Sequence, residues 1–146
     1  PEIMKVGVGD LFDSLRKLLS TELKDLKVDI SVSCANETVS IDRSQIEQVL
    51  INLLKNAAES GGEKIELTAQ LSSDNRWIVI AVKDDGEGIV PEAMERLFTP
   101  FFTTKPGGQG IGLAVCRQIV SKHGGTISAK SVPDVNGSVF TVRLPL

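Results

Sequence analysis

The sequence predicts an α/β fold, a two-layer sandwich in which one mixed, mostly antiparallel sheet is covered on one face by about three helices. Two observations predict it. Three stretches carry apolar residues at helical spacing, and pairs of short, alternating strand-like segments lie between them. With 146 residues, 41% of them hydrophobic and 24% charged, the chain is long enough for one domain with a sizeable core.

The first half of the chain begins with leucines at helical spacing over residues 10–24, and Asp10 is the expected N-cap. Two strands are expected next, at 28–34 and 38–41. A long helix then follows the N-cap Asp42, with Gln45 in the capping-box position. We expect it to run to about residue 60, where two glycines end it.

The second half predicts a hairpin of strands 64–71 and 77–82 joined by the turn SSDNR. A short helix is expected at 91–96, and a longer one from a Gly-rich loop to His123, with Gly124 as its C-terminal cap. We expect His123 to have a structural role at the C-terminus of this helix, where a basic residue interacts favourably with the negative end of the helix dipole. Strands 126–132 and 138–144 complete the predicted sheet.

The composition excludes several classes of function. A net charge of −3 gives no reason to expect nucleic acid or an anionic membrane as a partner. No apolar run approaches the roughly 20 residues of a membrane span. Cys34 and Cys116 lack metal-ligand spacing, so we expect buried free thiols in a reducing, cytoplasmic compartment. The chain opens without Met, and residues 1–146 are expected to be a single domain cut from a larger protein.

Three polar residues lie along one border of the apolar stripe of the helix at 42–60: Asn52, Asn56 and Glu59. They could line the rim of a pocket, or they could be an ordinary helix boundary. Asparagine gains little on a merely solvated helix face, but the helix by itself does not separate the two interpretations.

The stretch DDGEGI, residues 84–89, places two carboxylates and two glycines directly after an apolar strand. It could be a surface turn, a metal loop or a pocket that the backbone must approach closely. An EF-hand loop starting at Asp84 is excluded, because Gly86 and Gly88 would fall at ligand positions and Ile89 at the required glycine.

Glycines 108, 110 and 112 surround the start of the last helix, where free backbone N–H groups and the helix dipole favour an anion such as phosphate. Their spacing is not that of a Rossmann fingerprint, and no G-K-[ST] is present for a P-loop. A protein-kinase catalytic loop is excluded as well, because Gly124 follows the one histidine.

Four motifs, taken in order, resemble the catalytic, ATP-binding domain of bacterial sensor histidine kinases, in the superfamily of gyrase, Hsp90 and MutL. They are an N box (NLLKNAAES, 52–60), a G box (DDGEGI, 84–89), an F box (LFTPFFTTK, 97–105) and a second G box (GQGIGLAV, 108–115). The ending GSVFTVRLPL is similar to the closing G-T-x-F strand of this family, with Ser138 in place of Thr. Each motif is common by itself, whereas the ordered set covers almost the whole chain.

The resemblance implies that the domain binds ATP and Mg²⁺. Asp84 would accept a hydrogen bond from the exocyclic amine of adenine, and Ser138 could share a water with it. Asp85 is expected to be only a solvated neighbour. Asn56 would coordinate Mg²⁺, and Asn52 would lie near the same phosphates. The remaining nucleotide contacts that it implies are Gly86, Gly88, Ile89, Phe102, Lys105, Gly108, Gly110, Ile111, Gly112 and Leu113.

The resemblance also separates phosphotransfer from hydrolysis. Hydrolases of the superfamily carry a glutamate base where this chain has Asn52, which cannot take a proton, so transfer to a protein nucleophile is favoured. Glu59 stands where many members have a basic residue that contacts phosphate. Because that contact is absent here, Lys105 becomes more important, and Asn52 and Lys105 are the two predicted catalytic residues. These features and the short lid resemble the nitrogen-regulation type of histidine kinase.

The expected function is donation of the γ-phosphate to a histidine on a separate dimerisation and phosphotransfer domain of the same protein, in two-component signal transduction. A response regulator would act downstream, and the isolated domain is expected to be monomeric, without nucleic-acid or membrane contact. The alternatives are a degenerate ATP-binding module that signals by conformation and an ATPase of the same superfamily.

Overall fold

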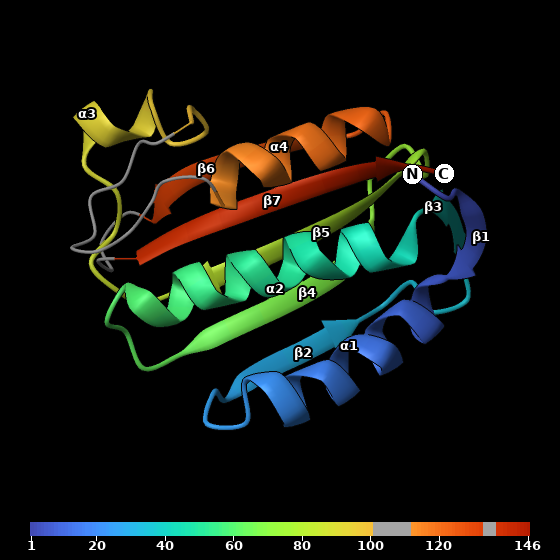
Figure 1. Ribbon diagram of the computed structural model, residues 1–146, viewed down its shortest axis with the longest axis horizontal. Coiled ribbons are helices and arrows are strands. Elements are labelled where there is room, and N and C mark those ends of the chain that lie inside the picture. The colour runs from blue at the N-terminus through green and yellow to red at the C-terminus, as the bar shows by residue number, and fades with distance from the viewer. Residues whose placement is uncertain (101–111, 133–136) are drawn as a thin grey trace.

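The computed structural model describes residues 1–100, 112–132 and 137–146 and confirms the predicted two-layer α/β fold (Figure 1). A five-stranded sheet has the strand order β2-β4-β5-β7-β6. Its strands are β2 (Val28–Val32), β4 (Ile65–Leu71), β5 (Trp77–Asp84), β6 (Thr126–Val132) and β7 (Gly137–Pro145). Helices α1 (Val8–Glu22), α2 (Arg43–Glu59) and α4 (Gly112–Lys122) cover one face of it, and the short helix α3 (Pro91–Met94) lies beyond one end.

The sheet is mixed, as predicted: β2 and β4 are parallel, and the other neighbouring pairs are antiparallel. Alternate residues of β5 and β7 face the helices and are buried, as the period of a half-covered strand requires. Helix α2 lies at the centre of the helical layer, where Ile46, Leu50 and Leu54 are fully buried. Each such side chain contributes roughly 1.5–3 kcal/mol of transfer free energy.

Strand β1 (Met4–Gly7) was missed by the sequence analysis. It pairs with β3 (Thr38–Ile41) in a separate two-stranded sheet, so the second predicted strand does not join the main sheet. Four residues that pass from exposed to half-buried do not show the alternation by which strands are found in a sequence.

The predicted start of the first helix was also wrong. Helix α1 begins at Val8, and Gly7 occupies the N-cap without a side-chain hydrogen bond. The N–H groups of Val8 and Gly9 donate to the carbonyl oxygens of Glu37 (2.8 Å) and Ala35 (3.1 Å) instead. Because the loop between β2 and β3 satisfies these donors, no capping side chain is required and Asp10 lies within the first turn.

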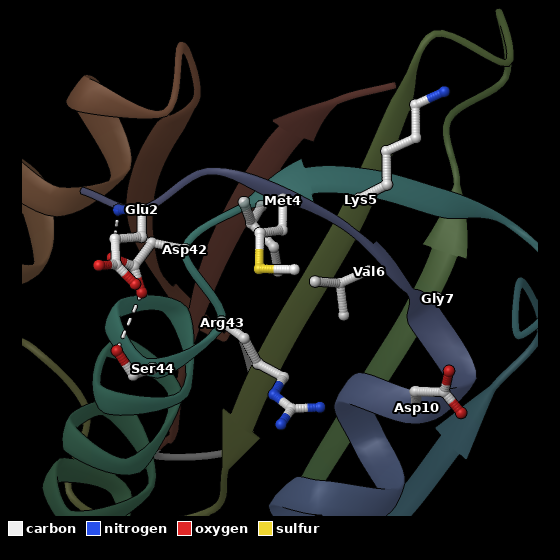
Figure 2. Close-up of a pocket in the computed structure, with 10 residues that line it drawn as sticks. Glu2, Met4, Lys5, Val6, Gly7, Asp10, Asp42, Arg43 and Ser44 are labelled. Atoms are coloured by element: carbon white, nitrogen blue, oxygen red, sulfur yellow. Dashed lines mark hydrogen bonds between the residues drawn. The ribbon is translucent and has the colours of Figure 1, made fainter.

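The predicted N-cap of α2 is confirmed. Asp42 Oδ1 accepts from the N–H of Gln45 (3.3 Å). Oδ1 also accepts from Ser44 Oγ (2.9 Å), and Oδ2 accepts from the N–H of Glu2 (2.9 Å) (Figure 2). These hydrogen bonds, first the one from Glu2, hold the pKa of Asp42 below its ordinary value. The reciprocal half of the capping box is replaced, because the Asp42 N–H donates to Nε2 of His123 (3.0 Å).

His123 joins the end of α4 to the start of α2. Its Nδ1 lies 2.7 Å from the carbonyl oxygen of Ile119. A carbonyl can only accept, so Nδ1 carries the proton and Nε2 is left to accept from Asp42. Gly124, with a φ of +75°, ends the helix as predicted. The structural role of His123 is therefore a hydrogen bond between two helix ends.

We expect His123→Leu to lower the free energy of unfolding by about 1–3 kcal/mol, because the partly buried Asp42 N–H would lose its acceptor. Urea denaturation measures the change. Lys122→Ala, at the exposed neighbour in the same turn, serves as the control and should stay within about 0.5 kcal/mol of the unchanged chain. Equal midpoints for both variants would contradict this role.

Candidate functional site

Asp84 ends strand β5, where it pairs with Ile65 of β4 and Ser138 of β7. Its side chain is buried, with 3% exposure. Oδ1 accepts from Ser60 Oγ (3.0 Å) and from the N–H of Gly86 (2.9 Å), while Oδ2 accepts from Ser138 Oγ (2.8 Å). A buried carboxylate requires such donors, and here they come from α2, the following loop and β7.

Two glycines permit this close packing. A Cβ at Gly86 would lie 2.0 Å from Ser60 Oγ and 2.6 Å from the Ser60 carbonyl oxygen, and a Cβ at Gly137 would lie 2.1 Å from the Asp84 carbonyl oxygen. Gly88 has a φ of +78°, which favours glycine for its backbone alone. The approach of a purine to Gly86 and Gly88 stays a prediction, while the packing on Ser60 and the positive φ are separate reasons for these glycines.

Asp85 is not merely a solvated neighbour, and that interpretation was wrong. Its Oδ1 accepts from the N–H groups of Glu63 (2.8 Å) and Lys64 (2.9 Å), which connect α2 to β4. These bonds, first the one from Lys64, lower the pKa of Asp85. The two adjacent carboxylates therefore differ in role: Asp85 is exposed and holds a turn, whereas Asp84 is buried at the end of the strand.

The two predicted asparagines lie on α2 upstream of this cluster. Asn52 and Asn56 are half-buried and one helical turn apart, and Ser60, the C-cap that follows α2, contacts Asp84. At a rise of 1.5 Å per residue, Asn56 lies roughly 6 Å and Asn52 roughly 12 Å back along the axis from Ser60. The helix thus places the asparagines in a row that leads away from the Asp84 carboxylate.

Helices α2 and α4 run antiparallel (Figure 1). His123 near the end of α4 contacts Asp42 at the start of α2, and Cys116, in the middle of α4, contacts Val49 and Asn52. Gly112, which begins α4, therefore lies toward the end of the domain where α2 finishes and Asp84 is buried. The positive end of the α4 dipole is located there.

Cys116 fixes the orientation of Asn52. The Cys116 thiol donates to the carbonyl oxygen of Val49 (3.9 Å), and its sulfur accepts from Asn52 Nδ2 (3.8 Å). Burial raises the pKa of Cys116 to about 11, so the thiol is protonated at neutral pH. Cys34 is buried and free as well, which agrees with the expectation for both cysteines.

The other predicted residues divide into two groups. Ile89 and Leu113 pack, half-buried, against the core, and Phe98 lies edge-on to Phe140 with ring centroids 6.3 Å apart. That contact packs the start of the F box against the core. The residues that lie outside the described part of the chain are Phe102, Lys105, Gly108, Gly110 and Ile111.

Ser60 was not predicted as a site residue, although its hydroxyl contacts the Asp84 carboxylate. The available signal was only that a small polar residue ends the N box. Only the fold shows its use, because Asp84 is 24 residues further along the chain.

A cavity of about 430 Å³ lies at the opposite end of the domain, between β1 and the starts of α1 and α2 (Figure 2). It is lined by Glu2, Met4, Lys5, Val6, Gly7, Asp10, Ile41, Asp42, Arg43 and Ser44, none of them a predicted site residue. Within residues 1–100, 112–132 and 137–146, no cluster of three or more His, Cys, Asp or Glu side chains could hold a metal. Helices in the same ranges are too short or too polar to cross a membrane.

Residues 41–146 match the family of histidine kinase-, DNA gyrase B- and HSP90-like ATPases, and the chain belongs to this family. It is 37% identical over 149 residues to the sensor histidine kinase ZraS of Salmonella typhimurium, a match that covers 99% of this chain and 31% of ZraS. The chain therefore spans about a third of that relative.

Solved structures show the same fold. The catalytic domain of the histidine kinase ThkA has a TM-score of 0.84 at 33% identity, covering 99% of this chain and 96% of that one. ThkA in complex with the response regulator TrrA has a TM-score of 0.79 at 31% identity, covering 98% of this chain and 41% of that one. Full-length ShkA in complex with AMPPNP has a TM-score of 0.80 at 26% identity, covering 99% of this chain and 31% of that one.

We expect Gly86→Ala to lower the free energy of unfolding by about 1–3 kcal/mol, because the new methyl group would overlap Ser60. Chemical denaturation followed by circular dichroism measures this. Gly112→Ala is the matched control, since a Cβ there meets no atom of the described residues outside its own helix within 4 Å, and it should not lower the free energy of unfolding by more than about 0.5 kcal/mol. Unchanged stability of the Gly86 variant would mean that Ser60 is not fixed against this loop.

Proposed function

We propose that this domain binds Mg-ATP and donates the γ-phosphate to a histidine on a separate dimerisation and phosphotransfer domain of the same protein. The observation that carries the proposal is the buried Asp84 carboxylate, held on both oxygens at the end of the domain where α2 finishes and α4 begins. Membership of the ATPase family and the similarity to sensor histidine kinases support it.

The Asp84 carboxylate suits recognition of adenine. A carboxylate offers about four acceptor positions, and the described residues supply three donors, two to Oδ1 and one to Oδ2. One further donor can be accepted, and the exocyclic amine of adenine is such a group. Guanine carries a carbonyl at that position, which the carboxylate would repel. Ser138 bonds to Asp84 directly, so any water that it shares with the base would be an additional contact.

The phosphates would lie along α2 toward the start of α4. Asn56 would offer an amide oxygen to Mg²⁺, which takes few protein ligands and several phosphate and water oxygens. Bound Mg²⁺ neutralises charge on the phosphates. Gly112 and Leu113 present backbone N–H groups at the helix start.

The residues outside the described ranges have the roles that the family resemblance gives them. Lys105 would contact the β- and γ-phosphates from a short lid of the nitrogen-regulation type. Gly108, Gly110 and Ile111 would complete the phosphate loop that leads into α4. Ile89 and Phe102 would contact the nucleotide.

Transfer is favoured over hydrolysis at this site. Asn52 occupies the position of the hydrolase base, and an amide cannot take a proton from water. Its Nδ2 donates to Cys116, a contact that orients the side chain without making it basic. Asn52 is therefore proposed to position the phosphates for attack by a protein nucleophile.

The proposed partners are the phosphotransfer domain of the same protein and a response regulator. ThkA, a similar kinase, was solved with the response regulator TrrA, and ShkA was solved with AMPPNP, an ATP analogue. We propose a cytoplasmic, monomeric domain without nucleic-acid contact, and the buried free thiols Cys34 and Cys116 support a reducing compartment.

We expect Asp84→Asn to weaken ATP binding roughly tenfold to a hundredfold, because the adenine amine would lose a charged acceptor. Isothermal titration calorimetry with Mg-ATP measures this. Asp85→Asn is the matched control: its Oδ1 still accepts from Glu63 and Lys64, and the affinity should change by less than about threefold. Equal losses would show that Asp84 does not read the base.

Transfer of phosphate to a histidine can be tested directly. The full-length protein, incubated with Mg²⁺ and γ-labelled ATP, should acquire label on a histidine that lies outside this chain, and Asn56→Ala should prevent it. Acid lability of the label identifies phosphohistidine. Binding of ATP without any labelled histidine would favour a degenerate signalling module, and steady release of phosphate instead of label would favour an ATPase.

A further inference from the structure

Ser60 lies at the junction of α2 and the Asp84 loop, and three contacts bind it there. It is the C-cap of α2, and its Oγ lies 3.0 Å from Asp84 Oδ1. Its carbonyl oxygen accepts from the N–H of Glu87 (3.1 Å). The place where Gly86 lacks a side chain is filled by the side chain and carbonyl oxygen of Ser60. The loop thus packs directly on this residue.

The Ser60 hydroxyl has two acceptors and one proton. The carbonyl oxygen of Ala57 lies 2.7 Å from Oγ, and Asp84 Oδ1 lies 3.0 Å from it. A hydrogen bond to an ionised carboxylate is stronger than one to a neutral carbonyl. Among the described residues, no Lys or Arg forms an ion pair with Asp84.

The donors are distributed unequally over the two carboxylate oxygens. Oδ1 accepts from Ser60 and from the Gly86 N–H, which fills its two acceptor positions. Oδ2 accepts from Ser138 among the described residues and keeps one position. Because Ser60 and Gly86 occupy Oδ1, rotation of the carboxylate is restricted and Oδ2 is the oxygen that can take a further donor.

We propose that Ser60 is a positioning residue for base recognition: it holds Oδ1 of Asp84 so that Oδ2 meets the exocyclic amine of adenine. This inference rests on the proposed binding of ATP at Asp84. Ser60 acts through Asp84 and has no contact with the nucleotide in this role. Loss of its hydroxyl therefore weakens recognition of the amine and leaves contacts to the sugar and phosphates unchanged.

The test compares two ligands, Mg-ATP and purine riboside triphosphate, which lacks the exocyclic amine. Ser60→Ala is expected to raise the dissociation constant for ATP about threefold to tenfold. The same variant should change the affinity for purine riboside triphosphate by less than about twofold. The readout is the ratio of the two affinities, which a general loosening of the fold would not change.

Ser20→Ala is the matched control. Ser20 Oγ donates to the carbonyl oxygen of Lys17 (2.8 Å), the same three-residue back-bond near a helix end, but on α1. It should leave both affinities unchanged. Equal losses of both ligands in Ser60→Ala would overturn the inference, since Ser60 would then only support the fold, and unchanged affinities would overturn it too.

The unchanged chain and Asp84→Asn separate this inference from the proposed function. If the unchanged chain binds both ligands equally, Asp84 does not recognise the amine, and the role of Ser60 fails together with the proposed adenine recognition; if it binds neither, the proposed function fails. If it prefers ATP and Asp84→Asn abolishes the preference while Ser60→Ala keeps it, the role of Ser60 fails and the proposed function stands.

Discussion

Burial of the Asp84 carboxylate constrains the packing of one whole end of the domain. A charge removed from water needs hydrogen-bond donors on both oxygens, and Ser60 of α2 and Ser138 of β7 provide them from opposite sides. Their approach leaves no room for side chains at Gly86 and Gly137. The end of the domain proposed to bind nucleotide is therefore also a place where two glycines cannot be replaced without displacing their neighbours.

The opposite end is fixed by a second polar cluster. Asp42 binds the N-terminal segment through the Glu2 N–H and caps α2, and its own N–H binds His123 of α4. The two central helices are thus tied together far from the candidate site. This contact holds α2 in register against α4, and with it the positions of Asn52 in the middle of α2 and of Gly112 at the other end.

The predicted architecture was mostly confirmed because its signals are local. Periodic apolar residues, the Asp42 cap and the terminal glycines of α2 need no information from elsewhere in the chain. Strand β1 and the start of α1 were missed because their hydrogen-bond partners lie more than 25 residues away, at β3 and at Glu37. Backbone groups satisfied by tertiary contacts leave no capping or alternating pattern in the sequence.

In the candidate site, the kinds of groups follow from the residue order alone: two asparagines a helical turn apart, a carboxylate at a strand end and glycines at a helix start. The family resemblance assigned the adenine amine to Asp84 and left Asp85 as a solvated neighbour, and it assigned no role to Ser60. The tertiary structure decided both, by burying one carboxylate against two hydroxyls and turning the other to backbone N–H groups. The physical reason is that a carboxylate acquires its role from its donors, and here most of them are distant in the sequence.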